Sequence, residues 1–320
     1  MTSKISQGIR DARSGVAPSG SGPRNGALNR ARKRSKRNIL FVMLLPSAAL
    51  LIALNFYPLL SAASQSLHSG NLLQAGQFVG LQNYTNLLSS SEFWNAAWFT
   101  VVFTVVGVFG SWAVGLGLAL LLRTRIPARG IFKVLLILPW VVPIVVSAMA
   151  WNWLVATPTS LIPSVFHAIG LGRPAFLADP FLAKVIVCVF KVWIAFPFMM
   201  LMSSAALSAV EPILYEAASI DGATRWQQFT RITLPMISRS TYISWILMMI
   251  FCVNDFPTIY LLTGGGPVHA STTLVVLAYQ LVFEDFLTGP GTAVAFMMTI
   301  ALGIVSVLLF RMIRKSSRTA

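Results

Sequence analysis

A short polar segment between two long apolar stretches carries the most informative chemistry of this chain. Glu216 opens the run E-A-A-S-I-D-G-A. Gly222 can supply a sharp bend there, because glycine tolerates positive φ, and Asp221 is suited to cap a following helix. Small side chains would let another backbone approach closely: Ala217, Ala218 and Ala223. This segment is suited to docking a partner rather than to bond-breaking chemistry.

The residues after the bend continue the same unit. Trp226, Phe229 and Ile232 recur at intervals of three and predict one apolar helix face. Pro235 is expected to end that helix and to open the next apolar stretch. Residues 211–235 therefore predict a helix-turn-helix protrusion with a carboxylate at its tip. An ordinary amphipathic loop is the alternative.

Two charged residues lie inside apolar stretches, namely Lys191 and Asp255. A charge near the centre of a bilayer costs roughly 2.5–3.5 kcal/mol on insertion scales, so such residues face a bundle interior and mark a pathway or a pair. One interpretation is that both contact a polar solute. The other is a structural ion pair that closes the bundle, and the sequence leaves both open.

Metal and catalytic chemistry have little support. Cys188 and Cys252 lie in apolar stretches without metal-ligand spacing, as expected for core thiols. The three histidines are scattered, and no phosphate-binding glycine-rich loop with its lysine occurs. We expect no metal site, no catalytic residue and no cofactor held by this chain.

The high hydrophobic content and low charged content of the chain indicate an integral membrane protein. Of the 320 residues, 56% are hydrophobic and 10% are charged, whereas soluble domains carry about 25% charged residues. The net charge of +15 could suggest nucleic acid, but the basic residues flank apolar spans instead of forming one face. A crossing helix needs about 20 apolar residues. Six stretches qualify and predict an all-α integral membrane protein with six transmembrane helices: 39–60, 96–122, 131–154, 182–207, 240–262 and 292–313.

The basic residues predict the orientation. All but three of the 24 lysines and arginines fall in the N-terminal tail, after span 2, after span 4 or at the C-terminus. The positive-inside rule places both termini and residues 211–235 in the cytoplasm. Residues 1–38 are expected to form a basic, disordered cytoplasmic tail, and residues 39–320 the transmembrane domain. The run Arg30 to Arg37 is a topology signal or a contact with anionic lipid. The apolar run 273–283 is too short to cross and predicts an interfacial or re-entrant helix.

The polar segment resembles the EAA loop of permease subunits of ABC importers. The pattern E-A-A-x-x-x-G-A, then an apolar residue, then I-x-x-P, is met at these positions: Glu216, Ala217, Ala218, Gly222, Ala223, Phe229, Ile232 and Pro235. The stretches 78–84 (F-V-G-L-Q-N-Y) and 262–267 (L-T-G-G-G-P) resemble the carbohydrate-uptake branch, the maltose-type permeases. The resemblance covers the chain from about Ile39 onward and implies a type I importer permease fold in a bacterial or archaeal plasma membrane.

The resemblance also implies partners and a pathway. A cytoplasmic ABC ATPase dimer would bind the loop, with Glu216 as the ion-pair partner of a basic residue, and would hold ATP and Mg. A second homologous permease and an extracytoplasmic solute-binding protein are implied as well. Spans 4 and 5 would supply the sugar-facing residues: Lys191, Trp193, Ile194, Ala195, Phe198, Asn254 and Asp255. Lys191 and Asp255 depart from the neutral residues expected there.

The substrate class remains open at this point. A di- or oligosaccharide is the first hypothesis, and glycerol 3-phosphate or a related phosphodiester is the alternative, because Lys191 could meet an anion. Two other classes of protein fit less well. A membrane-embedded enzyme would need clustered acids or a Ser/His pair, and a secondary transporter would show an inverted repeat.

Overall fold

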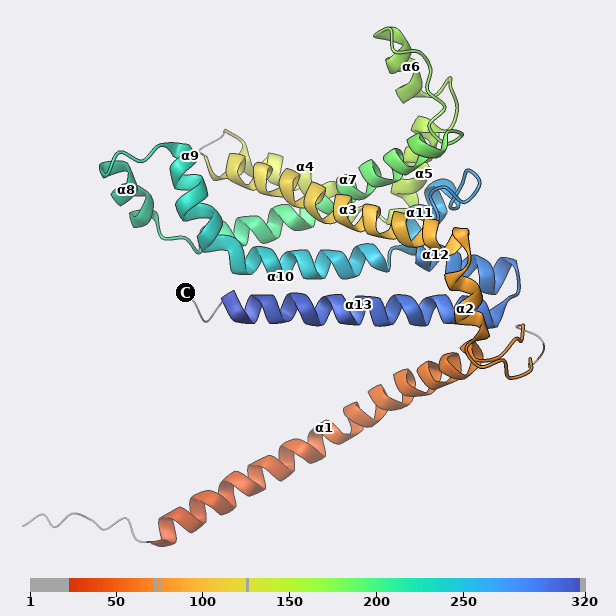
Figure 1. The fold of residues 1–320 in the computed structure, drawn as a ribbon. Coiled ribbons are helices and arrows are strands. Elements are labelled where there is room, and N and C mark those ends of the chain that lie inside the picture. The colour runs from red at the N-terminus through yellow and green to blue at the C-terminus, as the bar shows by residue number, and fades with distance from the viewer. Residues whose placement is uncertain (1–22, 72–73, 75, 125–126, 317–320) are drawn as a thin grey trace, which may run out of the picture. The chain divides into compact units, whose positions relative to one another are not determined.

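The computed structural model describes residues 23–71, 74, 76–124 and 127–316. Regular structure in this part of the chain is helical, apart from one isolated antiparallel bridge between His68 and Phe78. Figure 1 shows the helices, which are, in chain order: α1 Pro23–Ser66, α2 Gln82–Leu88, α3 Ser91–Arg123, α4 Arg129–Val141, α5 Ile144–Val155, α6 Leu161–Ala168, α7 Pro180–Ser208, α8 Pro212–Ile220, α9 Arg225–Gln228, α10 Leu234–Val253, α11 Phe256–Thr263, α12 Leu274–Tyr279 and α13 Thr288–Ser316. π-Helical turns follow α9 (Phe229–Thr233) and α12 (Gln280–Glu284). The chain divides into two compact units, Met1–Ser61 and Ala62–Ala320.

Helix α1 forms the described part of the first unit and continues to Ser66. Its apolar portion, Met43–Ser66, is long enough to cross a membrane. The helix already begins at Pro23, so the disorder expected as far as residue 38 is not what the structure shows for residues 23–38. The physical reason is composition, since this basic stretch is rich in Arg, Lys and Ala, which are strong helix formers. Residues 1–22 of the expected tail lie outside the described residues.

The second unit is built around α3 and α7, which run in the same direction and share the most extensive contact (Figure 1). Their interface buries large side chains completely, among them Phe103, Phe190 and Met199. A Cβ at Gly115 would lie 2.6 Å from the backbone nitrogen of Met200. The absent side chain therefore permits the close approach of the two helices.

Among the described residues five helices are long and apolar enough to cross a membrane alone. The predicted count of six is reached when the pair α4 and α5, which meet at an angle of 92°, is taken as one broken span. The break between α4 and α5 falls at Val142 and Pro143, because a proline has no N–H group with which to continue the helix. The span predicted at 240–262 is also interrupted, because α10 ends at Val253 and α11 begins at Phe256. The short apolar run expected at 273–283 is the helix α12 with its π-helical turn.

Different helices form the two ends of the second unit. Helices α8 and α9 lie at one end, together with the C-terminal end of α3 and the start of α4, whereas α6, α11 and α12 lie at the other end (Figure 1). Basic residues predicted to share one side of the membrane, such as Arg123, Arg129 and Arg225, thus belong to helix termini at the same end. Side-chain hydrogen bonds hold the opposite end together. Thr100 on α3 accepts from the Leu274 amide at 2.9 Å, and Asn152 on α5 donates to the Leu262 carbonyl at 3.0 Å.

Candidate functional site

The interruption between α10 and α11 places a carboxylate inside the bundle. Asp255 is the N-cap of α11, where its Oδ1 accepts from the Thr258 amide at 3.0 Å and its Oδ2 accepts from the Thr258 hydroxyl at 2.7 Å. A broken helix frees backbone N–H groups, which must find partners where water is scarce. The N-cap carboxylate supplies one such partner, and this explains why an acidic residue is tolerated at this depth.

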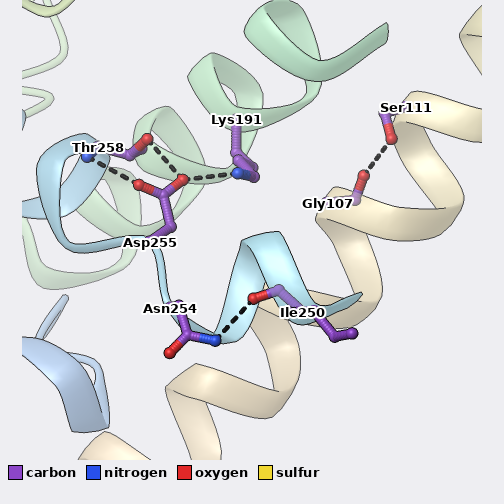
Figure 2. Close-up of polar contacts among 7 residues, drawn as sticks. All are labelled: Gly107, Ser111, Lys191, Ile250, Asn254, Asp255 and Thr258. Carbon is purple, nitrogen blue, oxygen red and sulfur yellow. Dashed lines mark hydrogen bonds and ion pairs between the residues drawn. The ribbon is translucent and has the colours of Figure 1, made fainter. Parts of the chain in front are cut away.

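The same carboxylate binds the buried cation (Figure 2). Lys191 on α7 donates from Nζ to Asp255 Oδ2 at 2.6 Å, and both side chains are 6–7% exposed. Helix α3 closes the site from the third side. A Cβ at Gly107 would lie 2.8 Å from Cys252 Sγ and 3.1 Å from Lys191 Cγ, so glycine leaves room for the pair. Of the two sequence interpretations, the structure shows the ion pair.

The predicted pathway residues on α7 do not all share one face. Lys191, Ile194, Ala195 and Phe198 are spaced as one helical stripe. The Phe198 ring lies 5.8 Å from Trp140 on α4 and 6.1 Å from Phe251 on α10. The structure thus brings Phe198 into an aromatic cluster, two helical turns along α7 from Lys191.

Two other predicted residues point elsewhere. Trp193 packs against Trp151 and Phe190, at ring distances of 5.5 and 5.9 Å, and lines a groove between α3 and α7. Asn254 is exposed and donates to the Ile250 carbonyl at 2.9 Å, away from Asp255 (Figure 2). The adjacent polar residues therefore differ in environment, because Asn254 is exposed and Asp255 is buried in the ion pair.

Trp140 and Phe251 were missed by the sequence reasoning. Both are large apolar side chains that remain 52% and 54% exposed in this chain. A signal existed for each, since Trp140 follows the proline of a broken span and Phe251 lies one helical turn before Asn254. We define the aromatic cluster as Trp140, Phe198 and Phe251. Trp151 on α5 packs against the core and contacts Phe190 on α7.

The protrusion at residues 211–235 has the predicted helix-bend-helix form. Helix α8 has no buried residue, and Gly222 adopts φ +78° after it, so the bend uses the left-handed conformation. The cap differs from the prediction. Asp221 is the C-cap of α8, and Thr224 caps α9 through a capping box with Gln227. The threonine forms the capping box because it directly precedes α9, whereas Asp221 lies three residues before that N-cap position.

The second arm of the protrusion continues into the membrane without a stop. The Leu234 amide bonds to the Phe229 carbonyl, which makes a π-helical turn directly before Pro235. The prediction that Pro235 ends this helix is wrong, since residues 225–253 form one continuous apolar helix. A widened turn accommodates a residue without an N–H group. Ile232 and Phe229 are half-buried, whereas Trp226 is 71% exposed, so the predicted stripe is only partly covered.

A polar contact holds the protrusion to α3. Tyr215 Oη lies 3.0 Å from Thr233 Oγ1 and accepts from Arg123 Nη1 at 3.1 Å, and the Arg123 guanidinium lies 4.7 Å above the Tyr215 ring. The outward face of α8 stays accessible. Its exposed residues include the predicted docking residues Glu216 and Ala217, whereas Ala218 and Ala223 are half-buried. Within the described residues Glu216 has no ion-pair partner, and no group of His, Cys, Asp or Glu could hold a metal ion.

Comparison with known proteins identifies the family. The family model described as binding-protein-dependent transport system inner membrane component matches residues 112–319. The chain belongs to this family. It is a permease subunit of an ABC importer and not an enzyme, because the ATPase of these transporters is a separate protein. It is a multi-pass membrane protein, and importers of this kind work with a binding protein and an ATPase.

Relatives and solved structures agree with this assignment. The chain is 34% identical over 241 residues to the trehalose/maltose transport system permease protein MalF of Thermococcus litoralis, which covers 75% of this chain and 82% of the relative. It is 31% identical over 279 residues to the sulfoquinovosyl glycerol transport system permease protein SmoG of Agrobacterium fabrum, covering 86% and 91%. A chain of a bacterial alginate ABC transporter shares the fold, with a TM-score of 0.77, 22% identity and coverage of 89% and 96%.

Proposed function

We propose that this chain is a sugar-translocating subunit of an ABC importer that takes up a di- or oligosaccharide. The observation that carries the proposal is the aromatic cluster, which α4, α7 and α10 form together. Half-exposed rings with a few fixed polar groups are typical of small-molecule sites, and they suit a ligand with apolar faces and hydroxyl edges. The relatives named above are described as transporting trehalose, maltose and a sulfoquinovosyl glycerol.

The alternative substrate, glycerol 3-phosphate or a related phosphodiester, is not favoured. It depended on Lys191 as an anion-binding group. The Lys191 ammonium is already bound to Asp255 at 2.6 Å and is shielded from solvent. An incoming anion would have to displace a buried carboxylate that two hydrogen bonds from Thr258 also hold in place.

The protrusion is the proposed contact with the motor. We assign the outward face of α8, with Glu216 and Ala217, to a cytoplasmic ATPase dimer that binds ATP and Mg, so this subunit needs no cofactor. Phe229, Ile232 and Pro235 then connect the docking face to the membrane helix α10. A second homologous permease and an extracytoplasmic binding protein complete the assembly. The proposal places both termini and the protrusion in the cytoplasm. The basic helix ends that lie together at one end of the second unit support this placement.

Uptake of labelled disaccharides and of glycerol 3-phosphate by proteoliposomes containing the complete importer tests the proposal. Trp140→Ala and Phe198→Ala should each lower the apparent affinity for the sugar about tenfold, whereas Trp153→Ala, which changes an exposed tryptophan outside the cluster, should leave it unchanged. Equal uptake by Trp140→Ala and wild type would exclude the cluster from the pathway. Uptake of glycerol 3-phosphate but of no sugar would overturn the substrate class.

A further inference from the structure

An apolar groove between α3 and α7 has no role in solute transport as described above. Its volume is about 760 Å³, and its lining runs from Trp98 to Val114 on α3 and from Phe181 to Phe196 on α7. Every lining residue but one is apolar or a buried thiol, and the exception is Lys184. At 1.5 Å per residue the groove extends about 22–24 Å along the helices. One hydrocarbon leaflet is about 15 Å deep, so an acyl chain fits along the groove.

A polar pocket adjoins the groove and shares Lys184 with it. This pocket has a volume of about 440 Å³ and lies at the end of the second unit that carries α11 and α12. Ser91, Glu92 and Asn95 line it from α3, and residues 267–270 close it from the loop before α12. The groove and the pocket therefore form one amphiphilic site, in which the groove is apolar and the pocket, called the mouth below, carries charged side chains.

The mouth carries one charge of each sign. Within the described residues Lys184 forms no ion pair, and its ammonium lies 5.8 Å from the centre of the Phe99 ring. Glu92 Oε1 lies 3.6 Å from His269 Nδ1, and these side chains are 47% and 54% exposed. An exposed pair at that distance contributes little, so Glu92 can accept from a second cation.

We propose that this site binds a phospholipid with a phosphoethanolamine head group. Lys184 binds the phosphate, Glu92 accepts from the primary ammonium, and one acyl chain fills the groove. A choline head group has no N–H to donate to Glu92, and a glycerol head group brings no cation. The occupant is thus a zwitterion with a hydrogen-bonding amine. Trp193, which lines the groove, contacts lipid in this proposal.

Retention of lipid by the full-length chain, purified with its partner subunits, tests the proposal. The complex is equilibrated in phosphatidylcholine nanodiscs that contain phosphatidylethanolamine or phosphatidylglycerol, extracted into detergent and weighed by native mass spectrometry. Wild type should retain phosphatidylethanolamine. Lys184→Gln should lower the retained fraction about tenfold, whereas Arg173→Gln, an exposed cation in the loop before α7, should not change it.

Two variants test the contact with the lipid head group and the contact with the acyl chain separately. Glu92→Gln changes an exposed side chain, and it should abolish the preference for ethanolamine over choline while binding persists. Val189→Trp fills the groove and should remove binding of all three lipids. Retention that no variant changes would overturn the proposal. A photocrosslinker at Val185 should capture lipid, and capture of a polypeptide would show instead that a partner helix covers the groove, which also overturns it.

Discussion

Replacing the two members of the buried ion pair, singly and together, gives the sharpest test of the site. Lys191→Met leaves the Asp255 carboxylate about 7% exposed, with only Thr258 as partner. Breaking a buried pair by removing one partner costs about 3–5 kcal/mol, which shifts the unfolding equilibrium more than a hundredfold. Asp255→Asn should cost a similar amount, because it leaves the Lys191 ammonium buried without a counter-charge.

The double variant Lys191→Met with Asp255→Asn should recover most of that loss. It contains no buried charge, and asparagine remains a good N-cap for α11. We expect its stability to lie within about 1 kcal/mol of wild type, so the double-mutant cycle should show a coupling of several kcal/mol. The assay is unfolding of the detergent-purified complex, followed by sugar uptake in proteoliposomes.

The two readouts separate stability from transport. If Lys191→Met costs less than about 1 kcal/mol, the reasoning from burial is refuted. A double variant that is stable and transports normally would restrict the pair to a structural role. A double variant that is stable, assembles and fails to transport would show that the pair also meets the solute.

Three further predictions concern the protrusion and the helix interface. Gly222→Val forces φ +78° on a β-branched residue and should uncouple ATP hydrolysis from uptake in the reconstituted importer, whereas Gly117→Ala, with open space around its Cβ, should not. Gly115→Ala places a Cβ 2.6 Å from the Met200 amide and should lower the melting temperature of the purified chain by several degrees, consistent with a loss of about 1–3 kcal/mol. Tyr215→Phe removes the hydroxyl's hydrogen bonds with Arg123 and Thr233 but keeps the ring, costs about 1 kcal/mol and should raise proteolysis of the protrusion; an unchanged cleavage rate would show that these hydrogen bonds do not hold it.

The sequence predicted the membrane segments well because their signals are local. Long apolar runs must form helices in lipid, and basic residues mark their ends. The bend at Gly222 was likewise predictable from one residue. The break after Val253 was not predicted, although Asp255 and Pro257 together are the start signal of a helix. The apolar run continues through them, so hydropathy alone concealed the interruption.

Side-chain direction was harder to predict than position. Trp193 and Phe198 were grouped because they are aromatic residues of one span, yet five residues of α-helix turn them to different surroundings. Counting the helical period from Lys191 would have separated them. The partners Trp140 and Phe251 come from other helices, and their meeting depends on tertiary packing that spacing in the chain does not encode.

The continuity of residues 225–253 has a mechanical consequence. At 1.5 Å per residue, this 29-residue helix is a rod of about 43 Å. A tilt of about 10° around its protruding end displaces the far tip by about 7 Å over that length. That tip is the turn at Asn254 and Asp255, so a tilt imposed at α9 moves the carboxylate that holds Lys191 farther than it moves the protruding end itself.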